Sequence, residues 1–446
     1  MSAYAVSARG LAGRKVPQGT LTPMGALLFS ASEQGAWYDP SDMSTLWQDS
    51  AGTVPVTAVE QPVGRILDKS GRGNHATQAT TTKRPVLSRR VNLFSATESP
   101  SSGSWTAVFA NVAGLTVTPI TSLEQHYIYS APALTVPGSA VVRFTARANG
   151  YPRIMLREGS VSGNMVLFDL ISGTVVNSQT YTGSITPSVD LPGWFDCTVN
   201  LTGKGDTAEV LAIVIGNSGT TNWATAAFAG DGVSGVDVTR LQFVRATDAN
   251  LPYQWVNTAT DYDADPAKFP AYLRFDGVDD ALQTGTIDFT GTDKMTVWAG
   301  VTKLSDAGSS VVAEFSNVFS SNNGTFVLFA PLTASPNYAS SARGSATSNC
   351  VSGAIASPNN AVVSTDANIG GNKHILRINQ AIAADSTGVA MGGGNFGNYP
   401  LYLGGRAASS LYFNGRLYSL IIRGAQSSLS QIEVTELYIK QKMRLP

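Results

Sequence analysis

The sequence predicts an all-β protein built from β-sandwiches, with a single helix near the C-terminus. Short runs of alternating apolar and polar residues, separated by Gly, Ser, Asn and Pro, recur along the chain, and such alternation is typical of strands that bury one face. Eight or more of these runs favour sandwiches. Because the one helical pattern comes after the strands, doubly wound and barrel α/β enzymes are excluded.

The strand pattern is clear at residues 194–201. Every second residue from Phe195 to Leu201 is apolar and would share one face of a strand. We therefore expect the Cys197 thiol in a sheet core. Similar runs predict strands at 141–146, 165–170, 210–215, 236–244, 295–301, 326–329, 374–378 and 417–422.

A helix is expected from Ser430 to about Met443. Ser430 and Glu433 have the spacing of a capping box, in which each side chain satisfies a backbone N–H at the helix start. Glu436 and Lys440 lie one turn apart and would add a stabilising pair.

Composition excludes several functions. The chain has 446 residues with 30 basic and 31 acidic side chains, net charge −1, so it offers no large basic field for nucleic acid or an anionic membrane. No stretch approaches the roughly 20 apolar residues of a membrane-spanning helix, and the N-terminus lacks the apolar core of a secretory signal. Cys197 and Cys350 are too few for a disulfide framework. We expect a protein that is made in a bacterial cytoplasm and kept soluble.

The C-terminal part of the chain carries a first resemblance. Residues 272–282 read Tyr-Leu-Arg-Phe-Asp-Gly-Val-Asp-Asp-Ala-Leu, residues 401–406 contain Leu-Tyr-Leu-Gly-Gly, and residues 413–442 contain an Asn-Gly turn, a strand and a helix. In this order they resemble a laminin-G-like, concanavalin A-like jelly roll, and residues 374–383 resemble its strand-turn-strand. The resemblance covers most of residues 270–446 and implies that fold.

Two N-terminal motifs alter the domain map. They are Asp-Pro-Ser-Asp at residues 39–42 and Asp-Lys-Ser-Gly-Arg-Gly-Asn-His-Ala-Thr-Gln at residues 68–78. Such segments usually precede the Phe-Asp-Gly strand directly. We therefore expect one discontinuous domain, residues 33–90 plus 261–446, interrupted at a surface loop that tolerates insertion. The alternative is a separate N-terminal anchoring domain that shares the motif.

The intervening residues 91–260 carry a second resemblance. Asn-Leu-Phe-Ser at 92–95 is followed by Trp105, Phe-Asp-Leu-x-x-Gly-Thr-Val, Gly-Trp-Phe and Pro-Tyr-Gln-Trp-Val. This order resembles the carbohydrate-binding-module-like jelly rolls of bacteriophage structural proteins. Residues 241–248 depart from the family's Gly-Ala-Gln-Leu-Glu-like strand, and this departure bears on binding more than on fold. Two jelly-roll sandwiches, one inserted in the other, are expected.

Together the resemblances imply a phage virion protein of the tail, baseplate or fibre group, located in the virion. The expected partners are other virion proteins, a host surface glycan, and further copies of the chain in a homo-oligomer, for which we expect a trimer. Residues 1–32 are rich in glycine without a usable period and are expected to be an anchoring arm that partners order.

Two other functions stay open. The sandwiches could serve as structural or cementing parts that contact neighbouring virion proteins and bind no sugar. A polysaccharide-degrading enzyme is the lesser alternative, because the long repeated β-helix of such phage enzymes is absent.

Neither catalysis nor a cofactor is expected. The histidines lie in three different segments and form no metal motif, so we expect loop or strand-face positions, with His374 pointing outward; they are His75, His126 and His374. The Gly-x-Gly-x-x-Gly pattern that begins at Gly392 has no βαβ unit around it and indicates a flexible loop.

Acidic clusters are the weak candidates for calcium. Asp276, Asp279 and Asp280 lie near a glycine and are expected to shape its turn, with metal binding as the lesser alternative. The alternating acids at residues 261–265 resemble a calcium loop, but Pro266 stands where an EF-hand has Gly. We prefer a solvated linker there.

Aromatic residues are the candidate sugar contacts, since pyranose rings present C–H faces that stack on Trp and Tyr. Trp105, Trp223 and Tyr253 lie beside Ser, Asn and Pro in loop-like surroundings, where binding residues are often presented. Trp194 and Trp298 lie in strand patterns and are expected to pack in cores.

Overall fold

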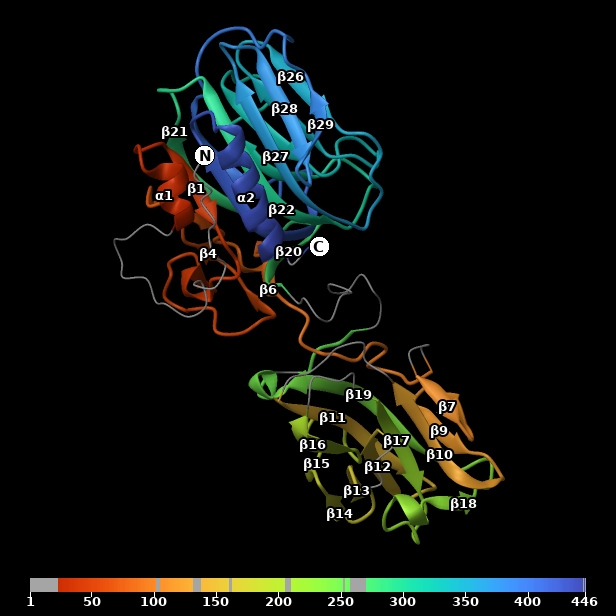
Figure 1. The fold of residues 1–446 in the computed structure, drawn as a ribbon. Helices are drawn as coiled ribbons and strands as arrows, with labels where there is room; N and C mark the ends of the chain where they lie inside the picture. Colours follow the sequence, from red (N-terminus) through yellow and green to blue (C-terminus); the bar gives the residue numbers. More distant parts are fainter. Residues whose placement is uncertain are drawn as a thin grey trace, which may run out of the picture. The chain divides into compact units, whose positions relative to one another are not determined.

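The computed structural model describes residues 23–101, 105–130, 138–159, 163–204, 210–251, 253–256, 270–443 and 445. Almost all of its elements are strands (Figure 1), so the predicted all-β class is confirmed. The described residues form two compact units. Unit 1 contains those up to Ser88 and those from Pro270 onward, and unit 2 contains those from Arg89 to Val256.

Two antiparallel sheets enclose the core of unit 1, in which Phe275, Phe315 and Leu420 are buried. The first sheet has the order β29 (Ala381–Asp385), β28 (Lys373–Ile378), β27 (Asn359–Asn368), β22 (Lys294–Lys303), β31 (Asn414–Arg423), β20 (Tyr272–Asp276), β6 (Val86–Ser88) and β3 (Gln61–Pro62), with β1 (Gly35–Tyr38) beside β31. The second has the order β2 (Leu46–Trp47), β4 (Arg65–Ile66), β5 (Ala76–Thr77), β21 (Leu282–Asp288), β30 (Asn398–Leu403), β23 (Val311–Phe315), β24 (Thr325–Phe329), β25 (Ala339–Arg343) and β26 (Thr347–Val351).

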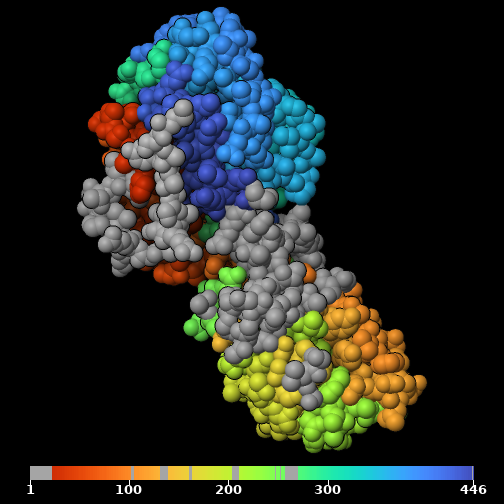
Figure 2. All heavy atoms as spheres, in the orientation of Figure 1, coloured from red at the N-terminus to blue at the C-terminus, as the bar shows by residue number. Residues whose placement is uncertain are grey.

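Strands from both ends of the chain therefore share each sheet of unit 1. In the first sheet Tyr272, at the start of β20, pairs with Ser88, at the end of β6. The chain leaves unit 1 and re-enters it at two directly paired positions. Figure 2 shows the red N-terminal and the dark-blue C-terminal residues side by side on the surface of this unit.

Two helices cover the outer face of the first sheet. They are α1 (Pro23–Phe29) and α2 (Leu429–Lys442), and their apolar side chains pack on Trp37 and Trp298. Both tryptophans are buried, as expected for Trp298. Gly300 of β22 permits the close approach of α2, because a Cβ at this position would lie 2.6 Å from the side chain of Ile439.

The start of α2 differs from the sequence prediction. Ser428 is the N-cap, with its hydroxyl accepting from the backbone N–H of Gln431 at 3.2 Å, while the Gln431 side chain accepts from the Ser428 N–H at 3.0 Å. The predicted capping box of Ser430 and Glu433 is wrong. Ser428 and Gln431 have the same spacing two residues earlier, and they form the capping box.

The N-terminal arm expected at residues 1–32 includes residues that belong to the fold of unit 1. Residues 1–22 lie outside the described part of the chain, but Pro23–Phe29 form α1, with Leu28 and Phe29 buried against the sheet. The sequence offers only two turns of pattern here, too short to show a period. Among the described residues no helix is both long enough and apolar enough to cross a membrane.

Unit 2 is a second antiparallel sandwich, with Phe144, Phe168 and Cys197 in its core. One sheet has the order β14 (Thr174–Gln179), β13 (Met165–Asp169), β12 (Arg153–Glu158), β17 (Leu211–Gly216), β10 (Leu123–Ser130) and β18 (Ala227–Ala229), with β7 (Thr106–Val108) beside β10. The other has the order β15 (Thr182–Pro187), β16 (Phe195–Lys204), β11 (Gly138–Asn149), β19 (Gly235–Arg245), β9 (Thr116–Pro119) and β8 (Ala110–Ala113).

Short 3-10 helices complete the elements: η1 (Met43–Thr45), η2 (Thr81–Lys83), η3 (Trp223–Thr225) and η4 (Ala246–Asp248). The two ends of unit 2 are tied to each other by one side chain. The Gln254 Oε1 accepts from the backbone N–H groups of Val91 (2.7 Å) and Asn92 (3.0 Å), and its Nε2 donates to the carbonyl of Arg89 (2.9 Å).

Candidate functional site

The N-terminal motif at residues 68–78 has a structural role. The Asp68 carboxylate accepts from the backbone N–H groups of Trp37 (2.8 Å) and Asn74 (3.0 Å), and Arg72 donates to the carbonyl of Phe29 at 2.7 Å. The His75 Nδ1 accepts from the Asp68 N–H at 2.9 Å. The motif thus fastens β1 and α1 to the sandwich.

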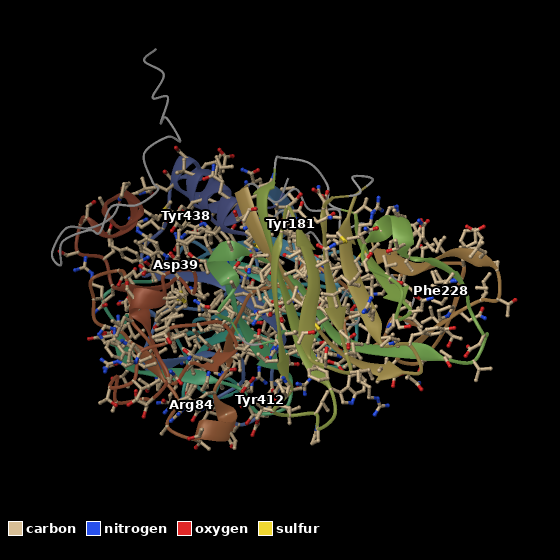
Figure 3. All side chains as sticks on the ribbon, turned by 90° about the horizontal axis from the view of Figure 1, so that it is seen from below. Asp39, Arg84, Tyr181, Phe228, Tyr412 and Tyr438 are labelled. Carbon is tan, nitrogen blue, oxygen red and sulfur yellow. The ribbon has the colours of Figure 1, made fainter. Side chains whose placement is uncertain are left out.

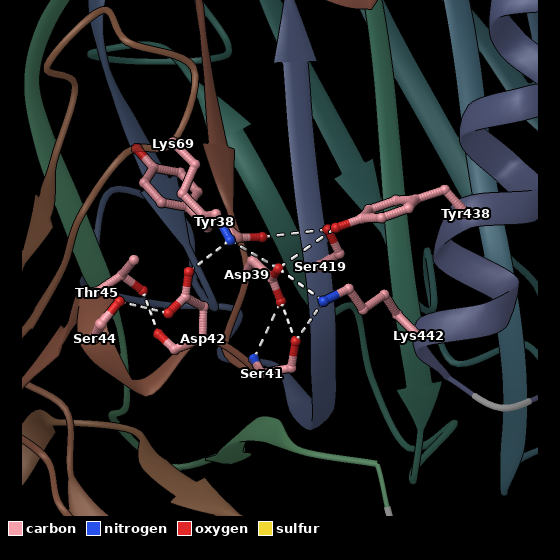
Figure 4. A network of polar contacts seen from close by, with 10 residues as sticks. All are labelled: Tyr38, Asp39, Ser41, Asp42, Ser44, Thr45, Lys69, Ser419, Tyr438 and Lys442. Atoms are coloured by element: carbon pink, nitrogen blue, oxygen red, sulfur yellow. Dashed lines mark hydrogen bonds and ion pairs between the residues drawn. The ribbon is translucent and has the colours of Figure 1, made fainter. Parts of the chain in front are cut away.

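The motif at residues 39–42 joins a closed network of ion pairs (Figure 4). Asp39, 1% exposed, receives Lys69 Nζ at 3.1 Å and Lys442 Nζ at 3.0 Å on the same carboxylate oxygen. The Tyr438 hydroxyl lies 3.5 Å from that oxygen, and both residues are labelled in Figure 3. Burial acts to raise the pKa of Asp39, but the two ammonium groups outweigh it and lower the pKa. The network clamps β1 to α2.

His374 is buried, so the expectation that it points outward is wrong. Its Nε2 lies 2.9 Å from the Ser340 hydroxyl and its Nδ1 3.2 Å from the Ser348 hydroxyl. Burial lowers the pKa of His374 to about 4. The reason is strand register, because His374 shares the inward face of β28 with Leu376 of the core.

The three carboxylates of Asp276, Asp279 and Asp280 gather at one turn. Asp276 Oδ1 accepts from the Val278 N–H at 2.8 Å, and Asp280 Oδ2 accepts from the Asp276 N–H at 3.1 Å, so these side chains shape the turn. Their ligand atoms lie within 4.8 Å of one another. Burial, and then the neighbouring Asp276, raise the pKa of Asp280 to about 7. Calcium binding here stays a prediction, and the acids at 261–265 lie outside the described residues.

Trp105 does not lie in an open loop, contrary to the sequence expectation. Its side chain is 9% exposed, its ring centroid lies 4.9 Å from that of Phe94, and its Nε1 donates to the Ala96 carbonyl at 3.3 Å. The ring belongs to the core of unit 2, and little of its surface is exposed. Trp194 is buried under the Arg147 guanidinium, as expected of a packing residue.

Trp223 belongs to an aromatic surface on the outer face of the β10–β17–β12 sheet. We define this aromatic surface as Tyr127, Tyr129, Trp223 and Arg157, all half-buried. The Tyr127 ring centroid lies 5.9 Å from that of Trp223 and 6.3 Å from that of Tyr129. The Arg157 guanidinium lies 3.9 Å from the Trp223 ring centroid and covers one of its faces.

Local sequence positions each ring. In β10, Ile128 points into the core, so Tyr127 and Tyr129 point outward by strand alternation. In η3 the Asn222 side chain caps the turn by accepting from the Thr225 N–H at 3.2 Å. The rings rest on apolar side chains that are fully buried beneath them, namely Met155, Met165, Leu167 and Val214.

Tyr253 lines a different feature, a polar pocket of about 300 Å³ on the outer face of the opposite sheet of unit 2. The pocket lies over β11, β16 and β19. Its polar lining includes Arg143, Asp196 and Gln242. The Tyr253 hydroxyl lies 2.7 Å from the Thr97 hydroxyl, and burial raises its pKa. Trp223 and Tyr253 are therefore not brought together.

Several residues of these surfaces were not singled out in the sequence. The alternation in residues 123–130 could have predicted that Tyr127 and Tyr129 lie on the same face of one strand. Gln242 could not be found in this way, because Arg240 has a φ of 50° and β19 slips its register against β11 at this point. Trp255, 48% exposed, was also missed.

Comparison with known proteins gives structural similarity alone. No protein-family model and no curated protein matches the chain. Among solved structures, the sialidase CBM40 module of Ruminococcus gnavus bound to α2,3-sialyllactose is 14% identical, with 34% of this chain and 97% of that chain covered and a TM-score of 0.27.

Two further structures have similar scores. A candidate carbohydrate-binding protein from Bacteroides ovatus is 10% identical, covers 69% of this chain and 78% of its own, and has a TM-score of 0.29. Domain 4 of the arabinanase AbnA from Geobacillus stearothermophilus, in complex with arabinotriose, is 13% identical, with 37% and 76% covered and a TM-score of 0.30. TM-scores of this size define neither a family nor a ligand.

Proposed function

We propose that the protein is a non-enzymatic carbohydrate-binding protein and that the aromatic surface of unit 2 contacts the glycan. The observation that carries this proposal is the grouping of three half-buried rings, Tyr127, Tyr129 and Trp223, on the outer face of one sheet. Aromatic rings of this kind combine an apolar face with a polar group at the edge. That combination suits a sugar, which has C–H faces and hydroxyl edges.

The groups around the rings supply polar contacts. Arg157 Nε is buried without a hydrogen-bond partner among the described residues, and the Gln125 amide donates to the Trp223 carbonyl at 3.3 Å, which holds η3 in place. None of the four residues of the aromatic surface is an acid, whereas glycoside hydrolysis ordinarily uses a pair of carboxylates. The surface therefore suits binding without cleavage.

The test is glycan binding by the full chain and its variants. A glycan array identifies a bound saccharide, and calorimetry then compares Trp223→Ala and Tyr127→Ala with the unsubstituted protein. We expect each variant to bind about tenfold more weakly, which corresponds to about 1.4 kcal/mol. The matched control is Trp255→Ala, which removes the exposed tryptophan of unit 2 that lies outside the aromatic surface.

Two outcomes would contradict the proposal. One is an array on which no glycan is retained. The other is loss of binding in the control variant with full binding in Trp223→Ala and Tyr127→Ala, which would place the sugar elsewhere on the protein.

We further propose that the bound glycan lies on a host cell and that the protein acts in a phage virion, as a homo-oligomer. This finer proposal is supported by the sequence resemblances at residues 91–260 and 270–446. Several linked copies of a weak site would raise avidity by about 10² to 10⁴ where their geometry allows simultaneous engagement. Mass spectrometry of purified particles and light scattering of the protein test it. Incorporation into particles without any glycan binding would support the structural alternative instead.

A further inference from the structure

We propose that unit 2 has a second binding site, the polar pocket over β11, β16 and β19, and that this pocket takes the carboxylate and neighbouring hydroxyls of an acidic sugar. The inference rests on the proposed function in one respect, that the ligand is a saccharide. The site is separate from the aromatic surface, because the two lie on opposite sheets of the sandwich.

The first argument is a pair of buried donors without acceptors. Gln242 is 1% exposed; its Oε1 accepts from the Gln254 N–H at 3.0 Å, but its Nε2 has no partner among the described residues. Arg143 donates through Nη2 to the Leu251 carbonyl at 2.9 Å, while its Nε is likewise buried and unpartnered. A buried donor without an acceptor is costly, so both groups favour a ligand that accepts hydrogen bonds.

The second argument is the position of these donors. Arg143 of β11 and Gln242 of β19 are directly opposite each other in the sheet, and opposite side chains on one face lie close together. Both line the pocket. Two parallel acceptors, as in a carboxylate, could therefore be bound by the two side chains at once.

The third argument is charge. Among the described residues Arg143 has no ion-pair partner, whereas Arg240 at the same pocket is paired with Asp190 at 3.0 Å. Burial lowers the pKa of Arg143, so removal from water disfavours its charged form. A carboxylate from a ligand would supply the missing negative charge in a partly desolvated site.

Asp196 distinguishes a sugar acid from a simple anion. Its carboxylate lines the same pocket, and its Oδ1 accepts from the Thr145 hydroxyl at 2.7 Å. It retains acceptor capacity for ligand hydroxyls, and it would repel a doubly charged phosphate more strongly than a singly charged carboxylate. A volume of about 300 Å³ is at the small end of ligand sites, so we expect one acidic sugar residue, with the Tyr253 ring as part of the wall.

Calorimetry on the full chain tests this with trigalacturonate and its methyl ester, which lacks the carboxylate charge and carries an added methyl group on each carboxyl. We expect the acid to bind at least tenfold more tightly than the ester. Arg143→Gln and Gln242→Leu should each weaken acid binding about tenfold. The matched control is Arg147→Gln, since Arg147 lies on the same strand and pairs with Asp237 at 2.7 Å outside the pocket. Melting curves check that each variant folds.

Each outcome decides the inference. Equal binding of acid and ester, or acid binding that survives both pocket variants, overturns it, and sugar binding that is then lost in Trp223→Ala leaves the proposed function intact. Inorganic phosphate that binds as tightly as trigalacturonate, and competes with it, overturns the sugar assignment. Acid binding that is lost in Arg143→Gln but retained in Trp223→Ala supports the second site even if the aromatic surface binds nothing. The comparison of acid with ester uses the unsubstituted protein alone, so it does not depend on the folding of any variant.

Discussion

His374 is a titratable ring enclosed by two serine hydroxyls in the core of unit 1. Burial lowers its pKa to about 4, while an unfolded chain restores a value of about 6.5. The neutral ring is therefore favoured in the folded state. Its contribution to stability is complete above about pH 6.5 and is lost as the pH falls toward 4.

We expect the free energy of unfolding to fall between pH 7 and pH 4 by on the order of 2 to 3 kcal/mol more in the unsubstituted protein than in His374→Gln. Urea unfolding at several pH values measures this difference, in which other titrating groups cancel. Burial also lowers the pKa of His75, which is half-buried, so His75→Gln should reduce the pH dependence in the same direction but by less than His374→Gln. Identical pH dependence in His374→Gln and the unsubstituted protein would refute the assignment.

At the scale of elements, α2 depends on a cap that the sequence pattern places two residues too late. Ser428 makes the capping contacts, so Ser428→Ala should lower the free energy of unfolding by about 1 kcal/mol. Ser430→Ala is the matched control, because it changes the same residue type at an exposed position inside the helix, where Ala has the higher helix propensity, and should leave the free energy of unfolding unchanged or raise it by a few tenths of a kcal/mol. Thermal or urea unfolding measures both. A larger loss in the Ser430 variant would restore the original prediction.

The sequence predicts elements wherever their signal is local. Cys197 is buried in β16, because alternation within one strand fixes which face is apolar. His374 follows the same alternation, since it shares the inward face of β28 with Leu376. Trp105 packs on Phe94, and neither residue lies in a strand, so alternation does not predict the burial of Trp105. Gln242 faces the candidate pocket where β19 shifts its register against β11, and alternation along one strand does not predict such a shift.

At the scale of the whole chain, we predict that unit 1 folds without unit 2. Because Ser88 and Tyr272 are paired neighbours in one sheet, a short Gly-Ser linker in place of residues 91–269 can join β6 to β20 without strain. The variant should be soluble, with a strand-type circular dichroism spectrum and one cooperative unfolding transition.

In a control deletion of residues 33–88 with the same linker, unit 1 should fail to fold while unit 2 still folds, since the deletion removes β1, β3 and β6 from the first sheet of unit 1. If the rest of unit 1 folds in this control, and the deletion of residues 91–269 aggregates, the discontinuous domain is wrong.

The two ties at the junction, Ser88 with Tyr272 on one side and Gln254 with Arg89 and Val91 on the other, together suggest an order of folding. Unit 2 is continuous in sequence and can form first. Once Gln254 joins Arg89 and Val91, the loop that must close when β6 pairs with β20 is shorter, so part of the entropy cost of closing it has already been met. Folding of unit 2 would then assist the folding of unit 1. A substitution that removes the Gln254 contacts would slow the folding of unit 1, which Gln254 does not contact.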